Sequence, residues 1–189
     1  MHTIRRIFHS RRIKLLCAGA TLLVVAGLVQ IEARVYVLTD DALVQAFPGA
    51  ETERKAKYLS KAQQAELRQL ADLERIGRFH TFYIARKNGQ VQGYALFDTH
   101  IVRTKEETVF VALNADGSVR TARIVSFFEP QEYLAPDRWL NIFQNKSARD
   151  DLRPGRDLPS ISGATLTTRA VSTAVRKTLH LHRVHFGGR

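Results

Sequence analysis

The residues of this chain with the clearest chemical potential are Ser162-Gly163-Ala164-Thr165, which precede a segment of helical periodicity. From Ala170 onward, apolar and small residues recur at helical spacing, which predicts a C-terminal helix that begins near Thr165. The first turn of a helix has unpaired N–H groups and a partial positive charge, so it suits an anion, and phosphate in particular. Hydroxyl donors are available at the same place, on Ser162, Thr165, Thr167 and Thr168.

The sequence SGATLT at residues 162–167 resembles the flavinylation motif of the FMN-binding domain family, best known in the G and C subunits of Rnf- and Nqr-type ion-translocating oxidoreductases. In that family the last Thr of SGAT takes FMN through a phosphoester bond, and the matching residue here is Thr165. Glu129-Pro130, and Trp139 with Phe143, resemble segments that precede SGAT in those subunits. The resemblance runs from about Phe79 to Leu179. It implies an FMN site made of Thr165, Ser162, Gly163, Ala164, Leu166, Thr167, Thr168, Glu129 and Tyr133.

Two segments depart from the family pattern. Pro159 stands three residues before Ser162, where the family usually has Asp, and Asp157 lies two residues earlier. The Gly-rich turn of the family is also missing after Glu129-Pro130, which makes Tyr133 a candidate stacking residue for the flavin ring. Trp139 and Phe143 have i,i+4 spacing, which favours a role in packing over flavin contact.

The N-terminus predicts a membrane anchor. Residues 1–14 contain five basic residues and no acid, and only Thr21 and Gln30 interrupt the 17-residue apolar run from Leu15 to Ile31. This run is just long enough to span a bilayer core, and the positive charges before it orient the N-terminus to the cytoplasm. We therefore expect a cytoplasmic basic segment at 1–14, a retained signal anchor in the cytoplasmic (inner) membrane at 15–33, a helical connecting region at 34–76 and an extracytoplasmic FMN-binding domain at 77–189.

The net charge of +11 does not by itself indicate a nucleic-acid partner. Five positive charges precede the apolar run, so the rest of the chain carries 11 − 5 = +6, and no acid follows Asp157. The sequence also lacks the stripe of basic and aromatic residues that is typical of nucleic-acid binding. The basic C-terminal helix is open to other interpretations, as a solvated face or as a surface that attracts phosphate, an acidic protein or anionic headgroups.

Periodicity predicts an α+β domain. Four strands with alternating apolar residues form two pairs, the first joined by Asn88-Gly89 and the second by Asn114–Gly117, which predicts an antiparallel meander covered by helices. The predicted strands are His80–Ala85, Val91–Phe97, Thr108–Leu113 and Ser118–Phe128. Helices are expected at Asp40–Phe47, from the capping box at Ser60 to about Leu73, at Asp137–Phe143 and from the SGAT turn onward.

Two further groups of polar residues have competing interpretations. His180, His182 and His185 have a spacing that could bind a transition metal, but no carboxylate or cysteine stands beside them, which favours a fraying basic tail. Asp98 and His100 alternate along a strand and could form an acid–base pair, although a solvent-facing strand end fits them better. The sequence therefore predicts no metal site and no catalytic group.

Two functions remain open at this point. The first is a membrane-anchored electron-transfer protein with FMN esterified to Thr165 by a FAD:protein FMN transferase. It would relay electrons to or from a membrane redox partner, as a component and not as a complete enzyme. The second is a cofactor-free envelope module that binds or assembles with proteins through its basic C-terminal helix, for which Pro159 in place of Asp is the main support.

Overall fold

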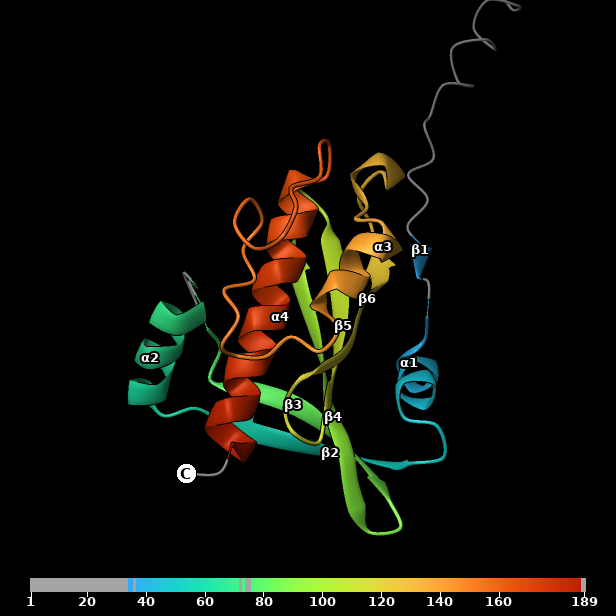
Figure 1. The fold of residues 1–189 in the computed structure, drawn as a ribbon, viewed down its shortest axis with the longest axis vertical. Coiled ribbons are helices and arrows are strands. Elements are labelled where there is room, and N and C mark those ends of the chain that lie inside the picture. The colour runs from blue at the N-terminus through green and yellow to red at the C-terminus, as the bar shows by residue number, and fades with distance from the viewer. Residues whose placement is uncertain (1–33, 36, 72, 74–75, 188–189) are drawn as a thin grey trace, which may run out of the picture. The chain divides into compact units, whose positions relative to one another are not determined.

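The protein folds around one six-stranded antiparallel sheet with the strand order β1-β6-β5-β4-β3-β2 (Figure 1). A computed structural model describes residues 34–35, 37–71, 73 and 76–187. They lie within a single compact unit, Glu32–Arg189. The α+β class is confirmed. The predicted segments 1–14 and 15–33 lie outside the described residues, and none of the described helices is long and apolar enough to cross a membrane.

The predicted meander is confirmed as the four central strands of the sheet. These strands are β3 (Phe79–Lys87), β4 (Gln90–Ile101), β5 (Glu106–Asn114) and β6 (Val119–Phe127). Asn88 and Gly89 both have positive φ, 52° and 75°, as the two-residue turn of a tight hairpin requires. Local turn chemistry therefore sets the register of β3 against β4.

Two edge strands were not expected from the sequence. β1 (Arg34–Val35) pairs with the end of β6, and β2 (Glu51–Tyr58) pairs with β3 along its whole length, from Glu51 opposite Arg86 to Tyr58 opposite Phe79. None of the β2 side chains is buried. Because the apolar alternation of a strand reflects one buried face, β2 has no such signal. Residues 34–76, expected to be helical, thus contribute strands as well as helices.

The helices lie on both faces of the sheet (Figure 1). α1 (Thr39–Ala46) packs on one face, while α2 (Lys61–Ala71), α3 (Asp137–Leu140) and α4 (Thr165–Phe186) cover the other. Two 3₁₀ turns, η2 (Gln131–Tyr133) and η3 (Asn141–Phe143), flank α3. The capping box is confirmed, since the Ser60 N–H donates to Gln63 Oε1 at 2.9 Å and the Gln63 N–H to Ser60 Oγ at 3.2 Å.

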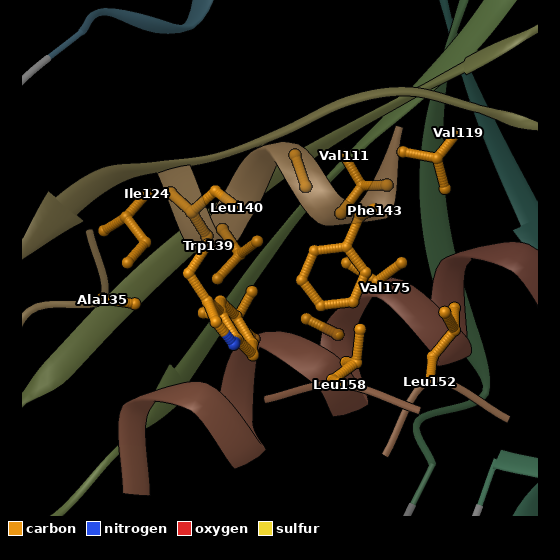
Figure 2. Close-up of a cluster of buried hydrophobic side chains, with 14 of the residues drawn as sticks. Val111, Val119, Ile124, Ala135, Trp139, Leu140, Phe143, Leu152, Leu158 and Val175 are labelled. Atoms are coloured by element: carbon orange, nitrogen blue, oxygen red, sulfur yellow. The ribbon is translucent and has the colours of Figure 1, made fainter. Parts of the chain in front are cut away.

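The largest core cluster lies between the sheet and α4 (Figure 2). Trp139 and Phe143 are buried there with their rings edge to face, 5.1 Å between centroids, and Val111 of β5 and Val175 of α4 lie beside Phe143. The indole N–H of Trp139 donates to the Pro159 carbonyl oxygen at 2.8 Å. The packing role expected for the two aromatic residues is confirmed, and Trp139 also fixes the loop that leads into α4.

The face of α4 opposite its apolar stripe, for which a solvated basic face was one interpretation, is exposed at Arg169 but largely covered beyond it. Arg176 and His180 are each 7% exposed, and Lys177 forms an ion pair with Asp98 of β4. Two segments enclose α4. The helix α2 packs against it, and the loop that precedes α4 is joined to it by a hydrogen bond from the Ser172 hydroxyl to the Leu152 carbonyl oxygen. A helix covered on several sides is buried around most of its circumference.

Candidate functional site

The N-terminal end of α4 borders a hollow of about 110 Å³ in which most of the predicted site residues meet. Three segments far apart in the sequence form its walls: the loop between β4 and β5, the segment that follows β6, and the start of α4 with the turn before it. The residues lining it are Val102, Arg103, Glu129, Tyr133, Gly163, Thr165, Leu166 and Thr167. Six of the nine residues predicted from the sequence thus line one hollow.

Thr165 is the first residue of α4, and its side chain is exposed at the hollow. Its hydroxyl donates to the Ile161 carbonyl oxygen at 3.3 Å, a long and therefore weak hydrogen bond. The N-cap residue Ala164 makes no side-chain hydrogen bond to the helix, and the first turn contains no acid. An anion at this position would therefore meet backbone N–H groups that no side chain already caps.

The other residues of the motif divide into exposed and buried ones. Ser162 is exposed but does not line the hollow, while Ala164 and Thr168 are buried. The Thr168 hydroxyl donates to the Thr165 carbonyl oxygen at 3.1 Å, so it is used within the helix. Gly163 has φ +84°, and a Cβ built on it would come no closer than 4.0 Å to any neighbour. Glycine is thus favoured at 163 by the backbone conformation and not by a lack of space.

Thr167 connects the helix to the segment after β6. It is almost fully buried, at 1% exposed, and its hydroxyl donates to the Tyr133 carbonyl oxygen at 2.6 Å. Tyr133 in turn packs partly against the core cluster beneath it. The guanidinium of Arg103 lies over the Tyr133 ring, 4.8 Å from its centroid. One face of the ring is thus occupied, and a flavin could stack there only if Arg103 moved.

Glu129 lines the hollow, but its carboxylate serves to hold the loop between β4 and β5. Its Oε1 accepts hydrogen bonds from the N–H groups of Arg103, Thr104 and Lys105, at 3.2, 2.6 and 2.8 Å. The hydrogen bond from the Thr104 N–H is the largest of the effects that hold the pKa of Glu129 below its usual value. Glu129 therefore acts on the hollow mainly by positioning Arg103.

The residues present fit a phosphate-bearing cofactor. The helix N-terminus, the exposed Thr165 hydroxyl and the Arg103 guanidinium supply positive charge and donors around one hollow. Residues 104–180 match the model of the FMN-binding domain family. This chain carries an FMN-binding domain. The protein is therefore a flavin-binding protein, and the matched region contains β5, β6, α3 and most of α4. No curated protein matches the chain.

The first departure from the family pattern, Pro159 with Asp157 two residues before it, has a structural role in this FMN-binding domain. The carbonyl oxygen of Pro159, at the position of the usual Asp, accepts the hydrogen bond from the Trp139 indole N–H. Asp157 accepts the N–H groups of Leu152 and Arg153 at 2.6 and 2.7 Å, so both of its oxygens stabilise the loop itself. Neither residue lines the hollow. Asp157 thus does not take the place of the family's carboxylate at the site.

Sequence reasoning missed Val102 and Arg103, which line the hollow from the loop between β4 and β5. That loop carries no motif. The sequence did contain a signal for this loop. In an antiparallel meander the start of one strand and the end of the next lie side by side, so the residues before Thr108 and those after Phe128 are at the same end of the sheet. The topology therefore places this loop close to Glu129.

The histidine group was interpreted wrongly as a fraying tail. His180 and His182 are each 7% exposed, and His182 packs edge to face on Tyr94, with 4.5 Å between the ring centroids. Burial lowers the pKa of both residues to about 4. The part of the chain that the structure describes contains no group of three metal-ligating residues.

Asp98 and His100 were also wrongly expected to face solvent. Asp98 pairs with Lys177 of α4, and His100 Nε2 lies 3.1 Å from Oε2 of Glu107, which is fully buried. Burial raises the pKa of Glu107 above its usual value, and its hydrogen bond with His100 opposes that change. These residues connect β4, β5 and α4 beneath the helix, and none of them lines the hollow.

Proposed function

We propose that this FMN-binding domain carries FMN esterified to Thr165 and transfers electrons between a membrane redox partner and a second protein. The position of the Thr165 hydroxyl carries the proposal: it is exposed at a hollow where the helix N-terminus and Arg103 both favour a phosphate. FMN supplies one- and two-electron chemistry when bound, and the protein tunes it through nearby charges and hydrogen bonds.

The attachment would be a phosphoryl transfer from FAD, catalysed by a FAD:protein FMN transferase. The Thr165 oxygen forms a bond to the phosphorus on the FMN side of the FAD diphosphate, the bond from that phosphorus to AMP breaks, and AMP leaves while the hydroxyl proton is lost. Among the described residues, the attack disrupts only the long hydrogen bond from the Thr165 hydroxyl to the Ile161 carbonyl oxygen. An exposed hydroxyl at the helix start is also open to a second protein.

The size of the hollow decides which part of FMN it would hold. About 110 Å³ is well below the roughly 300–1,000 Å³ of pockets that enclose drug-sized ligands. The hollow would therefore hold the phosphate and the start of the ribityl chain, and the flavin ring would lie outside it. An exposed ring suits a protein that exchanges electrons with other proteins and needs no substrate pocket of its own.

Support for a membrane location comes from the sequence. Five basic residues precede an apolar run of 17 residues, a pattern typical of an anchor with the following domain outside the cytoplasm. A covalent bond would keep FMN on a domain in a compartment that contains little free cofactor. We therefore propose an extracytoplasmic domain held at the cytoplasmic membrane beside its redox partner.

Attachment is tested by exporting the full chain together with a FAD:protein FMN transferase and measuring its intact mass. The wild-type chain should gain the mass of one FMN moiety and fluoresce in a denaturing gel, and the mass should map to the peptide containing Thr165. Thr165→Ala should lose both signals, whereas Ser160→Ala, which removes an exposed hydroxyl outside both the motif and the hollow, should keep them. Flavin retained covalently by Thr165→Ala would refute the assignment of the site.

A further inference from the structure

Arg103 lies at the hollow that holds Thr165, on a loop that no sequence motif marks. We propose that its guanidinium binds the phosphate of the FMN on Thr165 and so fixes the cofactor against the protein. This inference rests on the proposed function. It assigns to a residue outside the matched region, 104–180, a direct contact with the cofactor.

The backbone of Arg103 is held in place from below. Its N–H group donates to Glu129 Oε1 at 3.2 Å, and the two N–H groups that follow it donate to the same oxygen. A carboxylate that accepts several backbone N–H groups forms charge-assisted hydrogen bonds, which are stronger than neutral ones. The loop therefore has a fixed conformation at the point where the Arg103 side chain leaves it.

The side chain of Arg103 is held in place from the side. Its guanidinium lies 4.8 Å from the centroid of the Tyr133 ring, a cation–π contact. The Tyr133 backbone is in turn bound to α4, because its carbonyl oxygen accepts the Thr167 hydroxyl at 2.6 Å. Because Thr167 is two residues from Thr165 in the first turn of α4, these contacts position the guanidinium relative to that turn before any ligand binds.

The charges around the hollow favour Arg103 as the partner of an anion. Among the eight lining residues Arg103 is the one cation and Glu129 the one anion. The charge of Glu129 is offset by three backbone N–H groups. The Arg103 guanidinium donates no hydrogen bond to any residue that the structure describes, so its donors remain available. A guanidinium can give two parallel hydrogen bonds to a phosphate.

The size of the hollow makes the phosphate, and not the flavin ring, the group that Arg103 contacts. A phosphate is small enough for a space of about 110 Å³, whereas an isoalloxazine ring together with its ribityl chain is not. The phosphate is also the atom group bonded directly to the Thr165 oxygen. Arg103 and the N-terminus of α4 would therefore approach the same group from two sides.

The test compares loaded and unloaded forms of the full chain after export with the transferase. Arg103→Gln removes the charge, Arg103→Lys keeps it, and Arg169→Gln is the matched control, because Arg169 is exposed near the start of α4 but does not line the hollow. Two properties are measured: the ³¹P chemical shift of the attached phosphodiester, and the gain in Tm of each loaded chain over its own unloaded form.

We expect Arg169→Gln to match the wild type in both properties. Arg103→Gln should lose at least half of the Tm gain and show a displaced ³¹P signal, with Arg103→Lys between the two. If circular dichroism shows that Arg103→Gln is unfolded, the same two measurements on Arg103→Lys decide. An unchanged Tm gain and ³¹P shift in a folded, loaded Arg103→Gln chain would overturn the role of Arg103 and leave FMN attachment intact. A wild-type chain that gains no FMN mass would overturn both.

Discussion

The two ends of α4 each contain a polar motif, the SGAT turn at one end and the histidine group at the other, and the fold treats them in opposite ways. At the first turn, Thr165 is exposed at a hollow that the structure leaves open. In the last turns, His182 is buried against Tyr94 and Phe186. The first end retains donors for a ligand, whereas the second uses its polar rings as packing surface. Residue type alone therefore does not distinguish a site from a core. The neighbours that fold over each end make that distinction.

The largest effect that we expect from this contrast is a dependence of the free energy of unfolding on pH, caused by the buried histidines near the C-terminal end of α4. Burial lowers the folded-state pKa of His180 and His182 to about 4, below the usual 6.5. The unfolded chain therefore binds more protons between these values, so stability is fully present above pH 6.5 and is lost as the pH falls toward 4. We expect a loss on the order of 3 kcal/mol for each histidine, at about 1.4 kcal/mol per pKa unit.

Urea unfolding between pH 7 and 4 measures this dependence. His182→Phe should flatten the curve, because it replaces a titrating ring in an aromatic cluster with one that does not titrate. The first turn of α4, Thr165–Thr168, contains no titratable group, so variants there should follow the wild-type curve. An unchanged slope in His182→Phe would show that this end of the helix is more open than the structure indicates.

Substitutions of two leucines, one near each end of α4, compare how tightly the side chains are packed at the two ends. Leu181 is fully buried and Leu166 is 47% exposed, both on α4. Leu181→Ala should lower the free energy of unfolding by about 2–5 kcal/mol, because it leaves a cavity in a close-packed core. Leu166→Ala should change it by no more than about 0.5 kcal/mol. Equal losses in urea titrations would contradict the assignment of an open and a closed end.

Substitutions at two glycines, one near each end of α4, compare the backbone strain and the free space at the two ends. Gly163 and Gly117 have φ of +84° and +86°, but a Cβ on Gly117 would lie 2.7 Å from the His182 ring, while the nearest neighbour of one on Gly163 is 4.0 Å away. Gly163→Ala should cost about 1–2 kcal/mol of backbone strain. Gly117→Ala should cost more in thermal unfolding, since the His182 ring must also shift. A smaller loss for Gly117→Ala than for Gly163→Ala would contradict the tight packing of His182.

The smallest effect that we expect is a difference in stability between variants of Thr167 and Thr165, two threonines of the motif. Thr167→Val removes the hydroxyl that donates to the Tyr133 carbonyl and should cost about 1 kcal/mol. Thr165→Val removes only a long hydrogen bond at an exposed position and should leave stability within about 0.5 kcal/mol. Chemical denaturation of the unloaded chains measures both. A larger loss for Thr165→Val would mean that its hydroxyl supports the fold instead of facing a ligand.

The structure supports the sequence reasoning wherever short-range chemistry sets the structure. Asn88-Gly89 supplied the positive φ values that a tight hairpin needs, and Ser60 with Gln63 formed the expected capping box. The helix expected to begin near Thr165 is confirmed, since Thr165 is the first residue of α4. These signals are readable because the groups involved are within four residues of each other.

Where groups distant in the sequence meet, the sequence reasoning was incomplete or wrong. The strand β2 was missed because it has no buried face and is held by backbone pairing with β3. The Asp98–Lys177 pair joins a strand to a helix. Arg103 reaches the hollow only because Glu129 binds its loop and Tyr133 lies beneath its guanidinium. Each of these features depends on a partner that no local pattern names.

The sequence by itself determined the α+β class, the central hairpins, the start of α4 and the resemblance of SGATLT to a flavin attachment motif. Only the tertiary structure decided which polar residues remain open to a ligand. The physical reason is that turns, caps and periodicity follow from interactions between near neighbours along the chain. Burial, pKa and the shape of a hollow follow instead from segments such as 102–105, 129–133 and 163–167, which come together only in the folded molecule.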